Sequence, residues 1–301
     1  MKKIIFGILV ALFLISCGSD TPLSPPEPPP ELTLDDLEFG SGHTFDIMTW
    51  NVENYAKKGA TTIEYVTQIV EALEMDVIAL QEIRFYDHFT TLTSNLEGWD
   101  GYRTGSPASE SQRLAYLVNT ETVELLEDPY EIYQDQSYYF PRRPYVLEIS
   151  YDDAEFIIIN NHLKAFGDPE SVERRRQACI LLESYISTHH LDNNVILLGD
   201  LNDSLDKPPH TNVFQVFLDQ PEHYYFVDME IAEGPPYYWS YPTWPSHLDH
   251  IMITSSLFNA FGHHKSTVET ILLEKYLIGG WQTYEEYVSD HRPVALKLML
   301  D

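Results

Sequence analysis

The chain has 301 residues, and 44% of them are apolar, so it can form one large domain or two small ones with a sizeable core. Its 18 basic and 47 acidic side chains give a formal net charge of −29. This charge repels polyanions and argues against tight, non-specific binding of nucleic acid, which needs many phosphate contacts. An enzyme that engages only a few phosphates, or that uses a divalent cation as a bridge, remains compatible with it.

The N-terminus has the pattern of a targeting segment. Lys2 and Lys3 precede an apolar run, residues 4–15, that is too short to span a bilayer. The run ends in Leu-Ile-Ser-Cys17, which resembles a bacterial lipobox, and this resemblance implies a signal peptide over residues 1–16 and a lipid on Cys17. An ordinary signal peptide is the alternative. We therefore expect an exported lipoprotein, anchored to a membrane on the periplasmic or cell-surface side.

Residues 17–43 are predicted to form a linker, because residues 24–30 are rich in proline and favour an extended spacer. The folded domain is predicted over residues 44–301, where the sequence shows no further break in composition and no repeat. Cys179, the second cysteine, lies in a helical stretch. It is predicted to be a small buried apolar residue without a disulfide partner.

Strand-like and helical segments alternate along this domain. Predicted strands cover residues 45–50, 77–80, 114–118, 145–149, 156–160, 195–198, 248–253 and 294–298. Predicted helices cover residues 61–73 and 171–186, with Ser171 as a possible N-cap. The pattern indicates an α/β or α+β fold with mixed sheets and helices outside. Periodicity does not decide between one sheet and two.

Polar motifs follow several of these strands at the point where each strand ends. Hydrolysis of an anionic phosphate ester needs a cation, a base that activates water, and donors around the nonbridging oxygens. Glu82 is the best candidate ligand for a hard metal ion, with Asn51 beside it, although an ion pair with Arg84 or a turn role for Asn51 is possible. Asp200 and Asn202 lie two positions apart, so both side chains face the same way and can hold a water. An Asx turn is the simpler alternative.

Two histidines are candidates for gripping phosphate. A protonated imidazole at His162 or His291 neutralises charge and donates a hydrogen bond. Asp249 could accept a hydrogen bond from the second ring nitrogen of His291 and favour its charged form. The other histidines are interpreted as structural or exposed, including His247 and His250, because none has the spacing of a zinc motif.

Taken in order, these motifs resemble the endonuclease/exonuclease/phosphatase superfamily over residues 45–298. The resemblance implies a four-layer sandwich, in which two packed, mostly antiparallel mixed β-sheets are flanked by helices. It implies a metal-dependent phosphoric ester hydrolase that uses Mg²⁺, or Mn²⁺ or Ca²⁺, and we expect the protein to act as a monomer. The implied metal-side residues are Asn51, Glu82 and Asp290, the implied catalytic residues are His162, Asp200, Asn202, Asp249 and His291, and the implied phosphate-binding residues are Arg142 and the adjacent Arg143.

One departure from the deoxyribonuclease branch concerns the partner of His162. The glutamate of that branch is replaced by Gln112, which could bond to His162 without stabilising its positive charge. The arginines could instead form ion pairs, and the aromatic segment 237–244 could line a pocket, enter a membrane interface or belong to the core. We expect a nuclease-like phosphodiesterase. The alternatives are a lipid or small-molecule phosphoesterase, such as a sphingomyelinase-like or inositol phosphatase-like enzyme, and a non-catalytic surface binding module.

Overall fold

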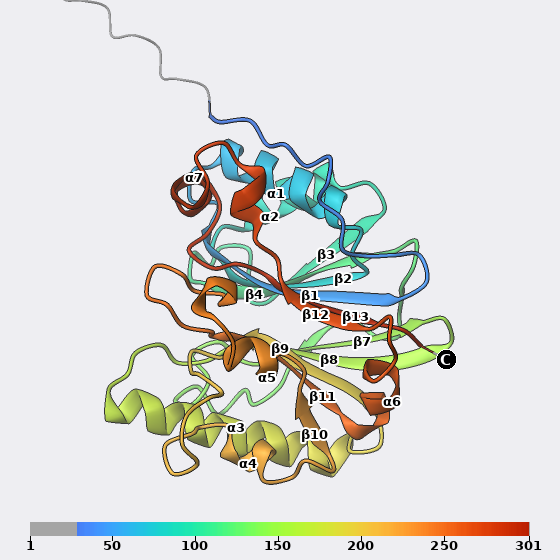
Figure 1. Cartoon of the computed structure of the whole chain (residues 1–301), viewed down its shortest axis with the longest axis vertical. Coiled ribbons are helices and arrows are strands. Elements are labelled where there is room, and N and C mark those ends of the chain that lie inside the picture. The colour runs from blue at the N-terminus through green and yellow to red at the C-terminus, as the bar shows by residue number, and fades with distance from the viewer. Residues whose placement is uncertain (1–28, 301) are drawn as a thin grey trace, which may run out of the picture.

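The computed structural model describes residues 29–300 (Figure 1). The predicted signal peptide, Cys17 and the first part of the predicted linker lie outside these residues. Two mixed β-sheets pack face to face, and helices cover their outer faces, which confirms the predicted four-layer sandwich.

The first sheet has six strands in the order β12-β13-β1-β2-β4-β3. Only the β1–β2 pair within it is parallel. Its strands are β1 (Phe45–Tyr55), β2 (Val77–Ile83), β3 (Trp99–Arg103), β4 (Arg113–Asn119), β12 (Thr267–Thr270) and β13 (Val294–Leu298).

The second sheet has seven strands, ordered β10-β11-β9-β8-β7-β5, with β6 paired to β7 beside this path. Only its β8–β9 pair is parallel. Its strands are β5 (Glu124–Leu125), β6 (Tyr130–Glu131), β7 (Tyr145–Tyr151), β8 (Ala154–His162), β9 (Asn194–Asp200), β10 (Tyr224–Phe226) and β11 (Asp249–Thr254).

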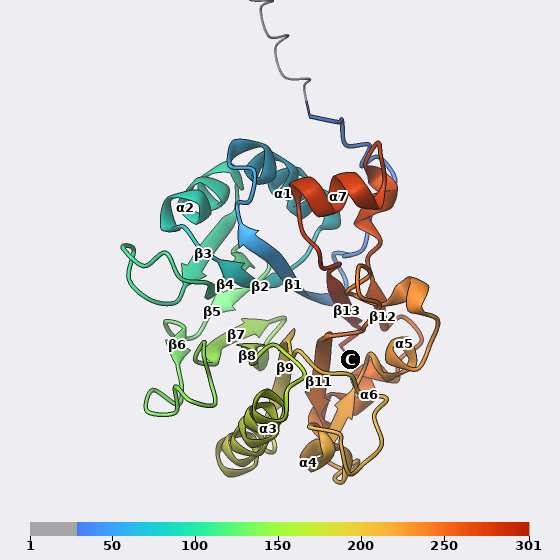
Figure 2. The ribbon, with the colours of Figure 1, turned by 90° about the vertical axis from the view of Figure 1, so that its left-hand side faces the viewer.

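Helices α1, α2 and α7 lie beside the first sheet, and α3 and α4 lie against the second, as the two views agree (Figures 1 and 2). The helix predicted over 171–186 is α3, and it begins earlier because Asp168, rather than Ser171, is its N-cap. The Asp168 carboxylate accepts a hydrogen bond from the Ser171 amide at 3.0 Å. The helical segments are α1 (Ala60–Leu73), α2 (Tyr86–Asn95), α3 (Pro169–His189), α4 (Gln215–Leu218), α5 (Met229–Ala232), α6 (Phe258–Phe261), α7 (Trp281–Tyr287) and the 3₁₀ turns η1 (Pro236–Tyr238), η2 (Ser255–Leu257) and η3 (Leu273–Tyr276).

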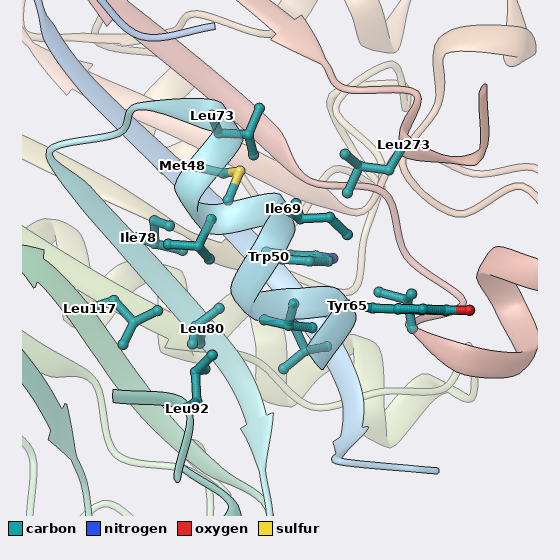
Figure 3. Packing of buried hydrophobic residues seen from close by; sticks show 14 of the residues in the cluster. Met48, Trp50, Tyr65, Ile69, Leu73, Ile78, Leu80, Leu92, Leu117 and Leu273 are labelled. Atoms are coloured by element: carbon teal, nitrogen blue, oxygen red, sulfur yellow. The ribbon is translucent and has the colours of Figure 1, made fainter. Parts of the chain in front are cut away.

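Alternation along the strands builds the layers of the core. In β1, Met48 and Trp50 face α1, whereas Phe45 and Ile47 face the second sheet. Figure 3 shows the side of α1 that carries Ile69 and Leu73 packed against Met48, Trp50, Ile78 and Leu80. A third cluster lies between α3 and the second sheet and contains the buried Cys179, as predicted.

The described part of the predicted linker touches the domain. Leu37 and Phe39 are buried in the same cluster as α1, and the Thr33 amide donates to the Tyr276 carbonyl at 2.9 Å. Residues 32–39 therefore pack on the domain, and the boundary at residue 44 stays a prediction. Within residues 29–300, no helix has the length and apolarity needed to cross a bilayer.

Candidate functional site

Strand register brings the polar motifs to one end of the sandwich. In the parallel β8–β9 pair, His162 lies opposite Asp200. Strand β11 runs antiparallel to β9, so its first residue, Asp249, meets the last residue of β9, Asp200. In the first sheet, Asn51 of β1 pairs with Gln81 of β2, the residue just before Glu82.

Asn51, Glu82, His162 and Asp200 line one cavity of about 840 Å³, and Asp249 lies behind its wall, bonded to His291. The cavity therefore collects side chains that are far apart in sequence, as the motifs predicted. Its lining includes Asn51, Glu82, Gln112, Arg142, His162, Lys164, Phe166, Arg174, Asp200, Asn202, Tyr241, Asp290 and His291.

Asp200 is at the centre of this group, and its side chain is 3% exposed. One oxygen accepts a hydrogen bond from the Asn51 amide at 2.9 Å and lies 3.3 Å from Nε2 of His162. The other oxygen accepts from the Asn202 backbone amide at 3.1 Å. Burial raises the pKa of Asp200 to about 7, against the opposing effect of the positive charge on His291. A carboxylate with this pKa can take a proton from water near neutral pH.

His291 forms the second charged element of the site. Its Nδ1 donates to the Asp249 carboxylate at 2.7 Å, and its Nε2 lies 4.0 Å from Asp200. Burial alone lowers the pKa of His291, but the negative charges of Asp249 and Asp200 prevail and raise it to about 10. His291 is therefore a buried imidazolium that can donate from Nε2 to an anionic oxygen. The ring of Tyr241 lies over it, with ring centroids 4.7 Å apart.

His162 differs from His291 in having no acidic partner on its Nδ1. That nitrogen is buried and has no hydrogen-bond partner among residues 29–300. The expected bond from Gln112 is not formed, because Gln112 donates to Asn54 at 3.1 Å and accepts from Arg142. Burial lowers the pKa of His162 well below its usual value, and the charge of Arg142 lowers it further. His162 is accordingly neutral.

The metal-side residues form a carboxylate-rich corner of the cavity. Glu82, at a backbone φ of 65°, accepts a hydrogen bond from the Asn54 amide at 2.9 Å. Burial raises the pKa of Asp290 to about 6, and the nearby charges of Glu53 and Glu82 add to this effect. The three carboxylates of Glu53, Glu82 and Asp290 lie near one another and suit a hard divalent cation, which prefers oxygen ligands. Glu82 and Asp290 are the residues that would hold it.

Asn51, Arg142 and Arg143 were predicted to belong to the site, and the structure shows where each side chain lies. The Asn51 side-chain amide faces Asp200, and its oxygen accepts from the Glu53 amide at 3.0 Å. Arg142 is largely buried in the cavity wall, whereas Arg143 points to Glu131, with 3.7 Å between their charged atoms. The structure therefore brings Arg142, and not Arg143, to the site.

The aromatic segment 237–244 is mostly exposed and is not a core layer. The exposed fractions of Tyr237, Tyr238 and Trp244 are 55%, 48% and 74%. Of this segment, Tyr241 lines the cavity. Sequence reasoning assigned no role to Tyr241 as an individual residue, or to Lys164, which ends the polar motif after β8. It also missed Phe166 and Arg174, for which no strand-end pattern provides a signal.

A second buried Asp–His group lies outside this cavity. Asp228 accepts from Nε2 of His247 at 3.0 Å and from Nδ1 of His250 at 2.6 Å. The other nitrogen of His250 donates to the Asp203 carbonyl at 2.8 Å, and that of His247 accepts from the Ser240 amide at 3.2 Å. Because every ring nitrogen already has a hydrogen-bond partner, these residues form a structural network rather than a metal site, as predicted for both histidines.

Comparison with solved structures shows the same fold in proteins of distant sequence. TDP2 from D. rerio, in complex with a single-strand DNA product, is 16% identical, with a TM-score of 0.64 over 85% of this chain and 98% of that one. A mannosyl-6-phosphatase from Bacteroides thetaiotaomicron is 14% identical, with a TM-score of 0.59 over 85% of this chain and 100% of that one. The human Nocturnin catalytic domain with bound sulfate is 18% identical, with a TM-score of 0.58 over 85% of this chain and 93% of that one.

Sequence comparison adds the family. No curated protein matches this chain. The profile of the Endonuclease/Exonuclease/phosphatase family, in contrast, matches residues 48–291, from within β1 to the predicted catalytic residue His291. The chain therefore belongs to the Endonuclease/Exonuclease/phosphatase family.

Proposed function

We propose that this protein is a divalent-metal-dependent phosphodiesterase of the nuclease type, which hydrolyses its substrate by attack of water on phosphorus. The observation that carries this proposal is the contact series from Glu82 through His162 and Asp200 to His291, in which the adjacent carboxylate oxygens and ring nitrogens lie 3.3 to 4.0 Å apart. The series combines a group that would hold a cation, a general base and a fixed imidazolium at one cavity, as phosphoryl transfer requires.

Each residue of the series has a defined task. Asp200 accepts the proton of the attacking water, and Asn202, whose side chain donates to the Leu163 carbonyl at 3.2 Å, is positioned beside it to orient the water. His291 donates to a nonbridging oxygen, while Arg142 adds a second positive charge. His162 contributes a neutral donor from Nε2. A Mg²⁺, Mn²⁺ or Ca²⁺ ion on Glu82 and Asp290 would neutralise charge that develops on the phosphoryl group.

The test is hydrolysis of bis(p-nitrophenyl) phosphate by the purified protein with Mg²⁺, Mn²⁺ or Ca²⁺, and with a chelator. We expect turnover that the chelator abolishes. Glu82→Ala should lower turnover and raise the metal concentration needed for half-maximal rate, because one carboxylate ligand is removed. The matched control is Glu97→Ala, which removes an exposed carboxylate. Absence of turnover with every ion would favour a binding module, and equal metal dependence of Glu82→Ala and the parent protein would refute the metal role of Glu82.

We further propose that Cys17 carries a lipid that tethers the catalytic domain to a membrane. The support is the order of basic residues, apolar run and cysteine at the N-terminus. Metabolic labelling with a fatty acid tests this proposal, and Cys17→Ser should lose the label. A labelled Cys17→Ser protein would contradict it.

A further inference from the structure

One wall of the cavity carries residues that the proposed hydrolysis does not use. Lys164, Phe166 and Arg174, here called the outer wall, line the same cavity as Asp200 and His291. We propose that the outer wall binds the part of the substrate beyond the scissile phosphate, and that this part is a nucleotide unit with a second phosphate and a base. This assignment rests on the proposed phosphodiesterase function.

The loop that carries Phe166 is fixed by the buried side chain of Arg175. Arg175 donates from one terminal nitrogen to the carbonyls of Lys164 and Phe166, at 2.6 and 2.7 Å. Its Nε and other terminal nitrogen bind the buried Asp203 carboxylate at 3.0 and 2.9 Å. Both carbonyls that flank Ala165 are thus fixed by an ion pair that is itself buried, so the outer wall is a built feature of the fold.

Phe166 is displayed to solvent at an energetic cost. Its side chain is 73% exposed, and its backbone φ of 81° lies in the left-handed region that non-glycine residues rarely adopt. An exposed aromatic ring at a fixed position in a cavity is the arrangement on which nucleobases stack. The ring therefore favours a substrate with a planar group over one with a purely aliphatic or sugar component.

The two cations of the outer wall are also arranged for a ligand. The Lys164 ammonium lies 4.3 Å from the centroid of the Phe166 ring. Arg174 donates from Nε to the Tyr138 carbonyl at 2.7 Å, and its guanidinium lies over the Tyr138 ring at 4.7 Å. Neither terminal nitrogen of Arg174 has a hydrogen-bond partner within residues 29–300, so both can bind an anion.

The positive charge of the outer wall indicates what it binds. In the proposed function, His291 and Arg142 serve the scissile phosphate, together with a cation that Glu82 and Asp290 would hold. In a chain with a net charge of −29, two more cations in the same cavity indicate a second anionic group on the substrate. The same net charge disfavours a long polynucleotide, so a short substrate with few phosphates fits best.

The experiment compares two thymidine dinucleotides, pTpT with a 5′-phosphate and TpT without it, and follows cleavage of the diester bond by chromatography. The parent protein should cleave pTpT with a kcat/KM about ten-fold or more above that for TpT, the range that charge-assisted hydrogen bonds provide. Lys164→Gln and Arg174→Gln should each reduce this preference about five-fold or more. The matched control is Lys265→Gln, which removes an exposed cation outside the cavity and should keep the preference.

Phe166→Ala supplies an independent measurement of the ring. Loss of a stacking partner should raise KM for both dinucleotides about ten-fold. Equal cleavage of pTpT and TpT by a protein that turns over bis(p-nitrophenyl) phosphate would overturn the second-phosphate assignment and leave the proposed function intact. An unchanged KM in Phe166→Ala would overturn the base assignment. Absence of metal-dependent turnover of all three substrates would overturn the proposed function and this assignment with it.

Discussion

Two buried groups in this molecule are built from aspartate and histidine, but they differ in how completely they are hydrogen-bonded and in the pKa of their central carboxyl group. The catalytic group contains Asp200, Asp249 and His291, and the structural group contains Asp228, His247 and His250. In the structural group, all four ring nitrogens and both oxygens of Asp228 have hydrogen-bond partners. In the catalytic site, one oxygen of Asp249 and Nδ1 of His162 have none among residues 29–300.

The difference appears in the pKa values of the two central carboxyl groups. Burial raises the pKa of Asp200 to about 7. Burial also acts to raise the pKa of Asp228, but the charge of His250 and the hydrogen bonds from both histidines prevail and lower it below its usual range. A lowered pKa means that the fold stabilises the carboxylate, whereas a raised one means that the fold tolerates it at a cost. The residue types of a buried Asp–His group do not show whether it is catalytic, but the hydrogen-bond partners of its carboxylates do.

The largest expected effect comes from Asp200→Asn. Removal of the base should lower kcat about 10²- to 10⁴-fold, measured on bis(p-nitrophenyl) phosphate. The amide keeps the shape of the side chain and removes a charge that the fold disfavours, so the melting temperature at pH 8 should stay equal or rise. Near-normal turnover, or a large loss of stability, would place Asp200 in the same class as Asp228.

Asp228→Asn should produce the opposite result. It removes the carboxylate that raises the pKa of the buried His250, and breaking a buried pair of this kind costs about 3 to 5 kcal/mol in the free energy of unfolding. Denaturant unfolding measures this loss, and kcat per folded molecule should fall less than ten-fold. A variant that is fully stable but inactive would show that the Asp228 network serves catalysis directly.

The pH dependence of stability sharpens the same contrast. The pKa of Asp228 is lowered on folding, so its contribution is present above about pH 4 and is lost as the pH falls through the folded value. The pKa of His250 is raised despite burial, because Asp228 holds its proton, so its contribution is present below about pH 6.5 and is lost as the pH rises through the folded value. The stability difference between the parent protein and Asp228→Asn should therefore be largest between about pH 4 and 6.5. A difference that does not vary from pH 3 to 9 would contradict the ionised pair.

The sequence predicted the fold and most of the site because both depend on strand ends. Apolar runs indicated the strands, and polar residues follow these runs. The β8–β9–β11 register brings His162, Asp200 and Asp249 together, and the β1–β2 register brings Asn51 next to Glu82. Side chains that reach the cavity from loops or helices had no such signal. The position of Phe166 depends on Arg175, which binds the carbonyls of Lys164 and Phe166 and also Asp203, 37 to 39 residues further along the chain. Local sequence pattern cannot predict such a contact, because it forms only in the folded chain.

Partner choice was also beyond the sequence. The family resemblance placed Gln112 where it could bond to His162. In the structure, its amide nitrogen instead donates to Asn54, and its amide oxygen accepts from Arg142. Similarly, Arg142 and Arg143 are adjacent and alike, and only the direction of the chain after Pro141 decides which one enters the cavity. Such choices are made by tertiary geometry after the elements have formed.

The smallest expected effect tests whether the two groups are coupled. Ser240 lies between them: its amide donates to His247, and its hydroxyl oxygen accepts from the amides of Leu248 and Asp249, at 3.1 and 3.2 Å. Ser240→Ala removes that acceptor from the Leu248 amide and from the buried Asp249 amide, which should cost about 1 to 3 kcal/mol in the free energy of unfolding.

If Ser240 transmits position from the structural group to Asp249, the same variant should also lower kcat several-fold, because Asp249 then holds His291 less firmly. Ser187→Ala, an exposed serine of α3, is the matched control and should change neither quantity. A stability loss in Ser240→Ala with an unchanged kcat would mean that the two groups share a strand without sharing a function. A joint loss would mean that the fully bonded group serves as the support on which the under-bonded, catalytic one is held.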